Sequence, residues 1–218
     1  YVTRPYISLQ RAQVSSAPML EHRIQTHFIE SADLQYQAAE PLSKSIAAAI
    51  HAVLASVTSG GKVLACGSAG GVALAHYFAA QLVGRFERER PGLPALALDG
   101  DSTALVAAAD NPHEAPQVLA RQVRALGQAG DVLLVLCPDG DAPPALEAVA
   151  AAHGRDMTVV ALSGKGGGRM GAALRETDVH IGVPHERLAR IQEVHLLALH
   201  CICDGVDAQL LGEQEIPS

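Results

Sequence analysis

A predicted strand, a glycine turn and a predicted helix follow one another between Lys62 and Arg90, and this stretch most constrains the fold. Val63 to Ala65 are apolar and predict a buried strand. Gly67 to Gly71 form a turn of small residues, and the apolar spacing from Val72 to Phe86 predicts a helix. Backbone N–H groups at the start of a helix are unpaired, so this arrangement can hold an anion such as phosphate. The glycines match neither the G-x-G-x-x-G dinucleotide pattern nor a Walker loop.

The rest of the chain alternates further strands with further helices. The predicted strands are Ala95 to Leu98, Asp131 to Cys137, Thr158 to Leu162 and Asp178 to Val183. The predicted helices begin near Thr103, at Pro116, at Ala145 and at Glu186. This alternation predicts an α/β protein with a doubly wound parallel sheet flanked by helices, a flavodoxin-like three-layer sandwich.

The N-terminal part of the chain carries more helix than one sheet needs. Helical spacing from Leu20 to about Ala39 and from Leu42 to Thr58, with Pro41 between, predicts two helices in an N-terminal arm. We expect this arm to pack against another subunit. Residues 1–18 show no sustained periodicity, and we expect a disordered or loosely ordered extension before a natural start at Met19. The predicted division is therefore 1–18, an oligomerisation segment 19–58 and a domain 59–218.

Composition excludes several classes of partner. The net charge of −7 argues against direct binding of nucleic acid, which needs clustered Lys and Arg. No apolar run reaches the roughly 20 residues that span a bilayer, so we expect no membrane partner. Cys66, Cys137, Cys201 and Cys203 have neither a disulfide-framework nor a metal-site spacing. Reduced thiols and a cytoplasmic location follow from this pattern.

The order of elements resembles the sugar isomerase (SIS) domain family, from about Met19 to Leu211. The resemblance rests on A-C-G-S-A-G-G, G-R-F-E-R-E-R-P, G-Q-A-G-D-V-L-L, V-V-A-L-S-G-K-G-G-G and R-I-Q-E-V-H. Within that family the chain is similar to the phosphoheptose isomerase branch. M-L-E-H-R-I-Q and Q-V-R-A-L-G-Q-A-G-D-V-L-L are most similar to the DnaA initiator-associating (DiaA) group. The resemblance implies a homotetramer with the N-terminal helices in its interfaces. Enzymatic members isomerise sedoheptulose 7-phosphate with a Glu and a His, and some carry zinc.

The loop that holds phosphate in enzymatic members, S-T-S-G-N-S, is degenerate here. It falls on Cys137, Pro138, Asp139, Gly140, Asp141 and Ala142. Every hydroxyl is absent, and Pro138 removes a backbone N–H. Asp139 and Asp141 would face the phosphate, and like charges about 4–6 Å apart repel by several kcal/mol even at an effective dielectric near 20. Alternatively the two aspartates form only a solvated turn; both interpretations predict the loss of this phosphate site.

The catalytic positions implied by the resemblance are partly replaced. The family's Glu aligns with Gln81, whose amide cannot abstract a carbon-bound proton. Tyr77 stands where zinc-bearing members have a His ligand, so we expect no metal, and zinc only if the chain is an enzyme. Gln192 and His200 match the family's Gln and catalytic His, eight residues apart on one helix face. His200 is a relic proton carrier, a metal ligand or a hydrogen-bonded core residue.

Two further groups of residues are candidate contacts. Ser68, Asp101 and Ser102 follow predicted strands and could bind a sugar, although Asp101 and Ser102 could equally cap a helix. Leu210 and Leu211 could contact a partner or merely complete the packed face of the last helix.

The lost phosphate loop and Gln81 together predict a protein without catalysis, and the resemblance then implies a tetrameric adaptor. As in the DiaA group, it would bind the replication initiator DnaA and promote its assembly at the origin, with the initiator supplying the contact to DNA. Repeated identical sites would raise the effective concentration of the initiator there. The alternatives are a phosphoheptose isomerase acting on sedoheptulose 7-phosphate and a sugar-phosphate-binding sensor.

Overall fold

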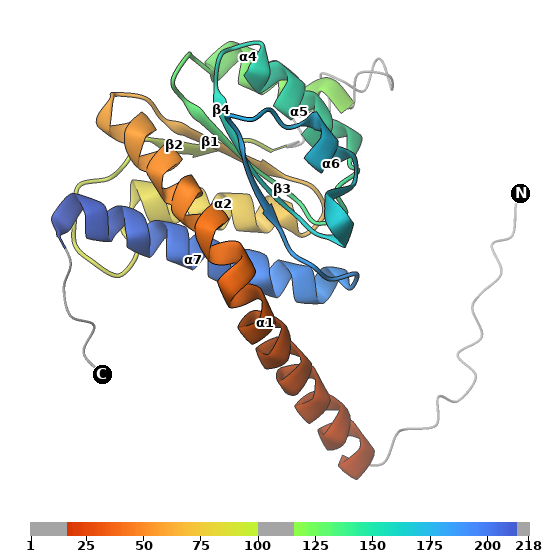
Figure 1. The fold of residues 1–218 in the computed structure, drawn as a ribbon. Coiled ribbons are helices and arrows are strands. Elements are labelled where there is room, and N and C mark those ends of the chain that lie inside the picture. The colour runs from red at the N-terminus through yellow and green to blue at the C-terminus, as the bar shows by residue number, and fades with distance from the viewer. Residues whose placement is uncertain (1–16, 100–115, 213–218) are drawn as a thin grey trace, which may run out of the picture.

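A computed structural model describes residues 17–99 and 116–212 of the chain (Figure 1). Most of the predicted extension, the predicted helix near Thr103, and the candidate residues Asp101 and Ser102 lie outside the described residues.

Five parallel strands form one sheet in the order β2-β1-β3-β4-β5. They are β1 (Val63–Gly67), β2 (Ala95–Ala97), β3 (Val132–Cys137), β4 (Thr158–Ser163) and β5 (Val179–Gly182). Every residue of β1 and β3 is buried, as expected of central strands with helices on both faces. The predicted α/β fold with a doubly wound parallel sheet is confirmed.

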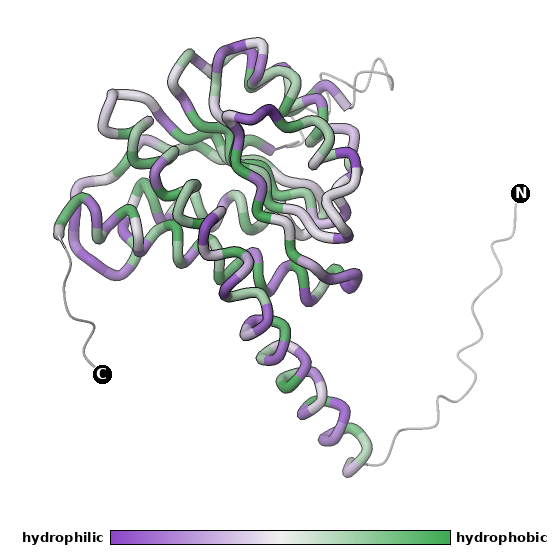
Figure 2. The backbone as a smooth tube through the Cα atoms, viewed as in Figure 1, coloured by the Kyte–Doolittle hydropathy of each residue, from purple (hydrophilic) through white to green (hydrophobic). Residues whose placement is uncertain are grey.

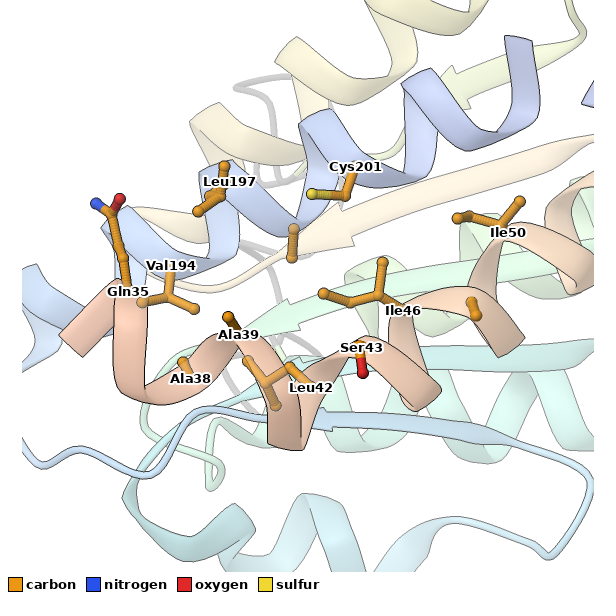
Figure 3. Close-up of a pocket in the computed structure, with 12 residues that line it drawn as sticks. Gln35, Ala38, Ala39, Leu42, Ser43, Ile46, Ile50, Val194, Leu197 and Cys201 are labelled. Carbon is orange, nitrogen blue, oxygen red and sulfur yellow. The ribbon is translucent and has the colours of Figure 1, made fainter. Parts of the chain in front are cut away.

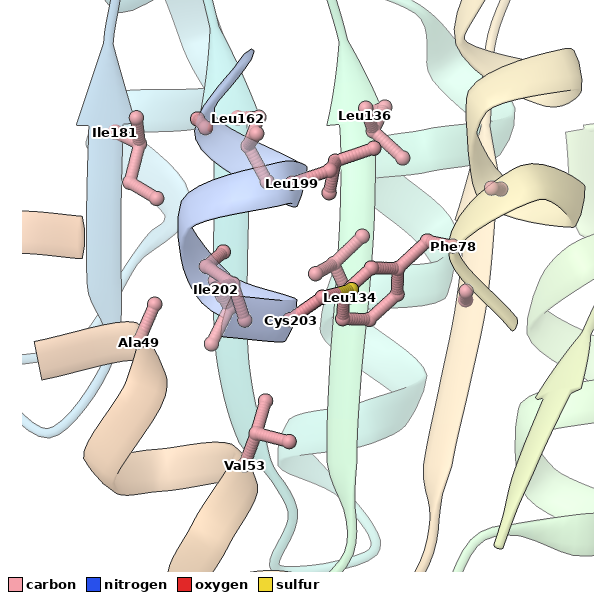
Figure 4. Close-up of a cluster of buried hydrophobic side chains, with 14 of the residues drawn as sticks. Ala49, Val53, Phe78, Leu134, Leu136, Leu162, Ile181, Leu199, Ile202 and Cys203 are labelled. Atoms are coloured by element: carbon pink, nitrogen blue, oxygen red, sulfur yellow. The ribbon is translucent and has the colours of Figure 1, made fainter. Parts of the chain in front are cut away.

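Helices cover both faces of this sheet. The first face packs against α1 (Ala17–Thr58), α2 (Gly71–Val83) and α7 (Leu188–Leu211). Figure 4 shows the core beneath them, a cluster of buried side chains that includes Phe78, Leu134 and Ile202. The second face packs against α4 (Val118–Leu126), α5 (Pro143–His153) and the short α6 (Gly168–Ala173). Each face thus has its own apolar core.

The predicted break at Pro41 is wrong, because α1 is a single helix of 42 residues with Pro41 inside it. A proline inside a helix leaves one carbonyl without its hydrogen bond. Pro41 is exposed, so water can satisfy that carbonyl. The arm does end at Thr58, as predicted, whereas the division into an oligomerisation segment and a domain stays a prediction.

The N-terminal half of α1 projects away from the body (Figure 1). Apolar residues alternate with polar ones along this projecting part (Figure 2), and several large apolar side chains there are exposed: Met19, Leu20, Ile24, Phe28 and Ile29. By length and composition alone α1 and α7 could cross a membrane, but this is weak evidence because core helices of globular proteins meet the same test. The packing of α7 against the sheet accounts for its apolar face.

The predicted glycine loop after β4 is also more ordered than expected. A 3-10 turn, η2 (Lys165–Gly167), leads directly into α6. Gly166, Gly167 and Gly168 all have positive φ angles, which place them in the region that glycine adopts without strain. Sequence periodicity missed α6 because six residues span less than two helical turns.

Candidate functional site

The sheet order creates a topological switch point between β1 and β3. From β1 the chain moves to β2 on one side, and it then returns to β3 on the other side of β1. Ligands of open α/β sheets bind outside the carboxyl ends of the strands at such a point. The β1–α2 turn and the β3–α5 loop flank it, and the backbone N–H of Ser68 donates to the carbonyl oxygen of Leu136 at 2.9 Å. We therefore take this edge as the candidate site.

The β1–α2 turn depends on glycine for its close packing. A Cβ added to Gly71 would lie 2.6 Å from the carbonyl oxygen of Leu136, and one added to Gly67 would clash with the backbone of Gly71. The side chain of Gln192 lies so close to Gly70 that a Cβ there would overlap it. The structure thus brings two predicted site residues, Ser68 and Gln192, to the same turn.

The two carboxylates of the β3–α5 loop have different hydrogen-bond partners. The Asp139 carboxylate accepts hydrogen bonds from the Cys137 thiol and from the backbone N–H of Asp141, both at 3.2 Å. The Asp141 carboxylate turns away and accepts from the backbone N–H of Arg169 at 2.9 Å, at the start of α6. The start of α6 thus supplies a donor to Asp141 that the sequence did not reveal, and the expectation that both charges face a bound phosphate stays a prediction.

Burial and hydrogen bonds set the protonation of this loop. Burial raises the pKa of Cys66 to about 12 and also raises the pKa of Cys137, so both thiols stay neutral. Burial acts to raise the pKa of Asp139 as well. Hydrogen bonds from the backbone of Asp141, the Cys137 thiol and the backbone of Ala142 outweigh burial and lower the pKa of Asp139. Asp139 is therefore ionised near neutral pH.

A second part of the site lies where α2 and α7 pack against each other. The Tyr77 hydroxyl and Nε2 of His200 lie 3.0 Å apart, and the Phe86 ring centroid lies 5.5 Å from that of His200. His200 is half-buried, so it is a hydrogen-bonded residue that still reaches solvent. Because a helix rises about 1.5 Å per residue, His200 lies about 12 Å along α7 from Gln192. Gln81 is half-buried one turn beyond Tyr77 on α2.

Tyr77 was not among the predicted site residues, although the sequence held a signal for it. Tyr77 and Gln81 are four residues apart, so they share one face of α2. The resemblance placed a zinc-ligand His at position 77. Interpreting Tyr77 only as a lost ligand overlooked that its hydroxyl could bond to His200.

This part of the site does not suit a zinc ion. Among the described residues no group of three or more His, Cys, Asp or Glu side chains could hold a metal. The groups here are a phenol on Tyr77, an amide on Gln81 and an imidazole on His200, whereas zinc sites use Cys, His and carboxylates.

His195 lies on the same helix as His200 but connects α7 to the sheet instead of facing Tyr77. Its side chain is fully buried, and Nε2 lies 3.1 Å from the carbonyl oxygen of Ser163 at the carboxyl end of β4. Burial lowers the pKa of His195 to about 4, against the opposing effect of that hydrogen bond. The neutral ring therefore ties α7 to the edge of the sheet that carries the site.

Two apolar surfaces lie away from the switch point. Leu210 and Leu211 are partly exposed at the far end of α7. A groove of about 320 Å³ lies between α1 and α7 (Figure 3), and it is lined mainly by apolar side chains such as Leu42, Ile46 and Leu197. Neither surface contributes to the candidate site.

Comparison with known proteins decides the family. The SIS domain matches residues 27–164. A phosphoheptose isomerase from Methylibium petroleiphilum is 60% identical over 91% of this chain and 98% of its own length. One from Azoarcus sp. is 52% identical over 88% of this chain and 98% of its own. The chain belongs to the SIS-domain family, in its phosphoheptose isomerase group.

Solved structures agree with this assignment. The phosphoheptose isomerase of Neisseria gonorrhoeae is 42% identical and superposes with a TM-score of 0.81, covering 87% of this chain and 99% of that one. The enzyme from Francisella tularensis is 38% identical with the same TM-score of 0.81, covering 85% and 97%.

These relatives overturn the predicted function. The chain was expected to be an adaptor for DnaA without catalysis, but relatives at 45–60% identity over most of its length are named phosphoheptose isomerases. Nor do they show the expected closeness to the DiaA group. The prediction failed because it gave Gln81 and one altered loop more weight than the rest of the chain.

Proposed function

We propose that this chain binds a phosphorylated heptose at the switch point and isomerises it, with sedoheptulose 7-phosphate as the substrate. Support comes from the phosphoheptose isomerases that match it almost end to end and from the hydrogen bond between Tyr77 and His200. That hydrogen bond is the observation that carries the proposal, because it joins two groups that can exchange a proton with a sugar.

The reaction moves one proton between C1 and C2 of the sugar and one between their oxygens. Imidazole is the side chain that most often carries protons near neutral pH, and we assign this role to His200. Tyr77 supplies a hydroxyl beside it that can donate to, or accept from, the imidazole. Gln81 can hydrogen-bond a sugar oxygen but cannot take a proton from carbon.

Turnover of sedoheptulose 7-phosphate by the purified protein tests this role for His200. Replacing His200→Gln removes the proton carrier, and we expect kcat to fall by about 100-fold or more. His51→Gln, at an exposed position on α1, is the matched control and should retain activity. Equal turnover by the wild-type protein and His200→Gln would remove His200 from the mechanism.

Gln81 favours a second candidate, a phosphosugar sensor that binds without turnover. A ligand at 100 times its Kd stabilises a protein by about 2.7 kcal/mol, so thermal unfolding with sedoheptulose 7-phosphate detects binding independently of catalysis. Stabilisation without conversion selects the sensor, and the absence of both contradicts both candidates.

We also propose that the chain works in the cytoplasm as a homotetramer. Support comes from the exposed apolar side chains on the projecting part of α1, among them Phe28 and Ile29. Light scattering after size exclusion should give the mass of four 22.7 kDa chains. Phe28→Glu should lower that mass, and a monomeric wild-type protein would contradict the proposal.

A further inference from the structure

The β3–α5 loop carries its own anion at the point where a ligand's phosphate would approach the sheet. We propose that the Asp139 carboxylate occupies the free backbone donors of this loop, and that a phosphorylated ligand binds there only by displacing it. This inference rests on the proposed binding of a phosphorylated sugar at the switch point. It adds a residue that sets the affinity for the phosphate group.

The first support is the position of the Asp139 carboxylate. It accepts from the backbone N–H of Asp141 and from the Cys137 thiol, both at 3.2 Å. The backbone of Ala142, the residue before α5, also stabilises the ionised form of Asp139 and lowers its pKa, against the effect of burial. A carboxylate therefore already sits where the amides at a helix start would receive phosphate.

The second support is that the other donors of this loop are absent or engaged. Pro138, Pro143 and Pro144 have no backbone N–H, and the last two open α5. The N–H of Gly140 donates to the carbonyl of Cys137 at 2.9 Å. The N–H of Arg169 donates to the Asp141 carboxylate. The backbone donors of this loop that remain for a ligand are therefore those that already bond to Asp139.

The third support is that packing fixes the backbone of the loop. Gly140 has a φ of 75°, and a Cβ on it would lie 2.6 Å from the carbonyl oxygen of Gly167. The N–H of Met170 donates to the carbonyl of Gly140 at 2.8 Å. The loop is thus held by η2 and α6 on one side, so the side chain of Asp139 rather than the backbone must move.

The fourth support is that Asp139 can leave. It is partly exposed at the mouth of the loop, whereas Cys137 beneath it is buried and stays neutral. A displaced Asp139 carboxylate can turn into water, where hydration stabilises its charge. Phosphate at this loop would therefore compete with one partly exposed carboxylate.

Calorimetric titration of the full chain tests the competition. Wild-type protein, Asp139→Asn and Asp139→Ala are each titrated with sedoheptulose 7-phosphate, unphosphorylated sedoheptulose and inorganic phosphate. We expect both variants to bind the phosphorylated sugar at least about tenfold more tightly than wild type, since a like charge is removed. Their affinity for unphosphorylated sedoheptulose should not change.

Asp141→Asn is the matched control, because its carboxylate is turned toward α6. It should change the affinity for the phosphorylated sugar by less than about twofold, since an exposed and more distant charge is screened by solvent. Thermal unfolding of each variant verifies that it is folded, and the isosteric Asp139→Asn guards against a folding defect in Asp139→Ala.

The outcomes separate this inference from the proposed function. If wild-type protein and both Asp139 variants bind the phosphorylated sugar equally, the inference fails while the proposed function stands. Tighter binding of inorganic phosphate by the variants, without sugar binding, supports the inference and contradicts the proposed function. Binding of none of the three ligands by any variant contradicts both.

Discussion

The β1–α2 turn and the β3–α5 loop lie side by side at the switch point, yet they differ in what they offer a ligand. The β1–α2 turn is built from small residues, and its backbone packs against Leu136 so closely that Gly71 admits no side chain. The β3–α5 loop carries two carboxylates and opens its helix with two prolines. The β1–α2 turn keeps a backbone geometry suited to a ligand. In the β3–α5 loop, backbone donors already bond to the carboxylate of Asp139.

This difference separates two kinds of constraint on the chain. Backbone packing at the β1–α2 turn is required by the fold, because β1 and β3 are neighbouring central strands. Side chains of the β3–α5 loop are not required by the fold and can change the ligand chemistry without changing the sheet. A family fold thus remains while one part of its site is altered.

The largest expected effect comes from breaking the β1–α2 turn. Gly71→Val places a branched side chain against the Leu136 carbonyl, and we expect a loss of about 3 kcal/mol in the free energy of unfolding. Gly154→Ala is the matched control, because a Cβ there would meet nothing closer than 3.5 Å. Urea unfolding of both variants measures the difference; equal stability would mean that the turn can rearrange.

The next effect is on the pH dependence of stability. It concerns His195, which contacts Ser163 at the carboxyl end of β4, beside the β3–α5 loop. Burial depresses the pKa of His195 to about 4, so the unfolded chain takes up a proton at a higher pH than the folded one. The stability contributed by neutral His195 is therefore present above about pH 6.5 and is lost as pH falls toward 4. The loss amounts to about 3 kcal/mol.

His195→Gln tests this pH dependence, because its amide can still donate to Ser163 and does not titrate. The difference in unfolding free energy between the two proteins should change between pH 7 and pH 4, with wild type losing more. Carboxyl groups titrate in both proteins, so their contribution cancels. Parallel curves would show that His195 is solvated.

A smaller effect, on kcat, is expected from the contact between α2 and α7. Tyr77→Phe removes the hydroxyl that pairs with His200, which corresponds to about 1 kcal/mol, or roughly a fivefold fall in kcat. Tyr36→Phe, on the exposed side of α1, removes the same atom without such a partner and should leave turnover unchanged. Equal rates for all three proteins would assign Tyr77 a packing role alone.

The smallest effect is the stability that Asp139 gives to its own loop. Asp139→Asn weakens hydrogen bonds from two backbone groups, and we expect a cost of about 0.5 kcal/mol, because an exposed carboxylate is screened by water. Hydrogen bonds lower the pKa of Asp139 despite burial, so this contribution is present above about pH 4 and is lost as pH falls below that value. Unfolding of both proteins at pH 7 and pH 3 should therefore show a smaller difference at pH 3 than at pH 7.

Periodicity and turn residues predicted most of the fold. The apolar runs of β1, β3 and β4 predicted central strands, because such strands are buried on both faces. Pro41 misled the prediction of α1, since a proline that faces water does not end a helix. The six-residue α6 was missed because it is too short for a periodic signal.

The candidate site was less predictable because it depends on contacts across the chain. Asp141 turns to Arg169, 28 positions later, and Tyr77 meets His200, 123 positions later. No local pattern encodes either pairing. The resemblance to the family located both regions, but only the structure shows which side chains are already hydrogen-bonded.

Exchange of carbon-bound protons tests the central claim most directly. The protein is incubated with sedoheptulose 7-phosphate in D₂O, and proton NMR follows C1 and C2 of the sugar. An isomerase that uses His200 incorporates deuterium at these carbons and forms the aldose phosphate, whereas His200→Gln does not. An unchanged sugar spectrum with wild-type protein, under conditions where the sugar raises its Tm, would contradict the account.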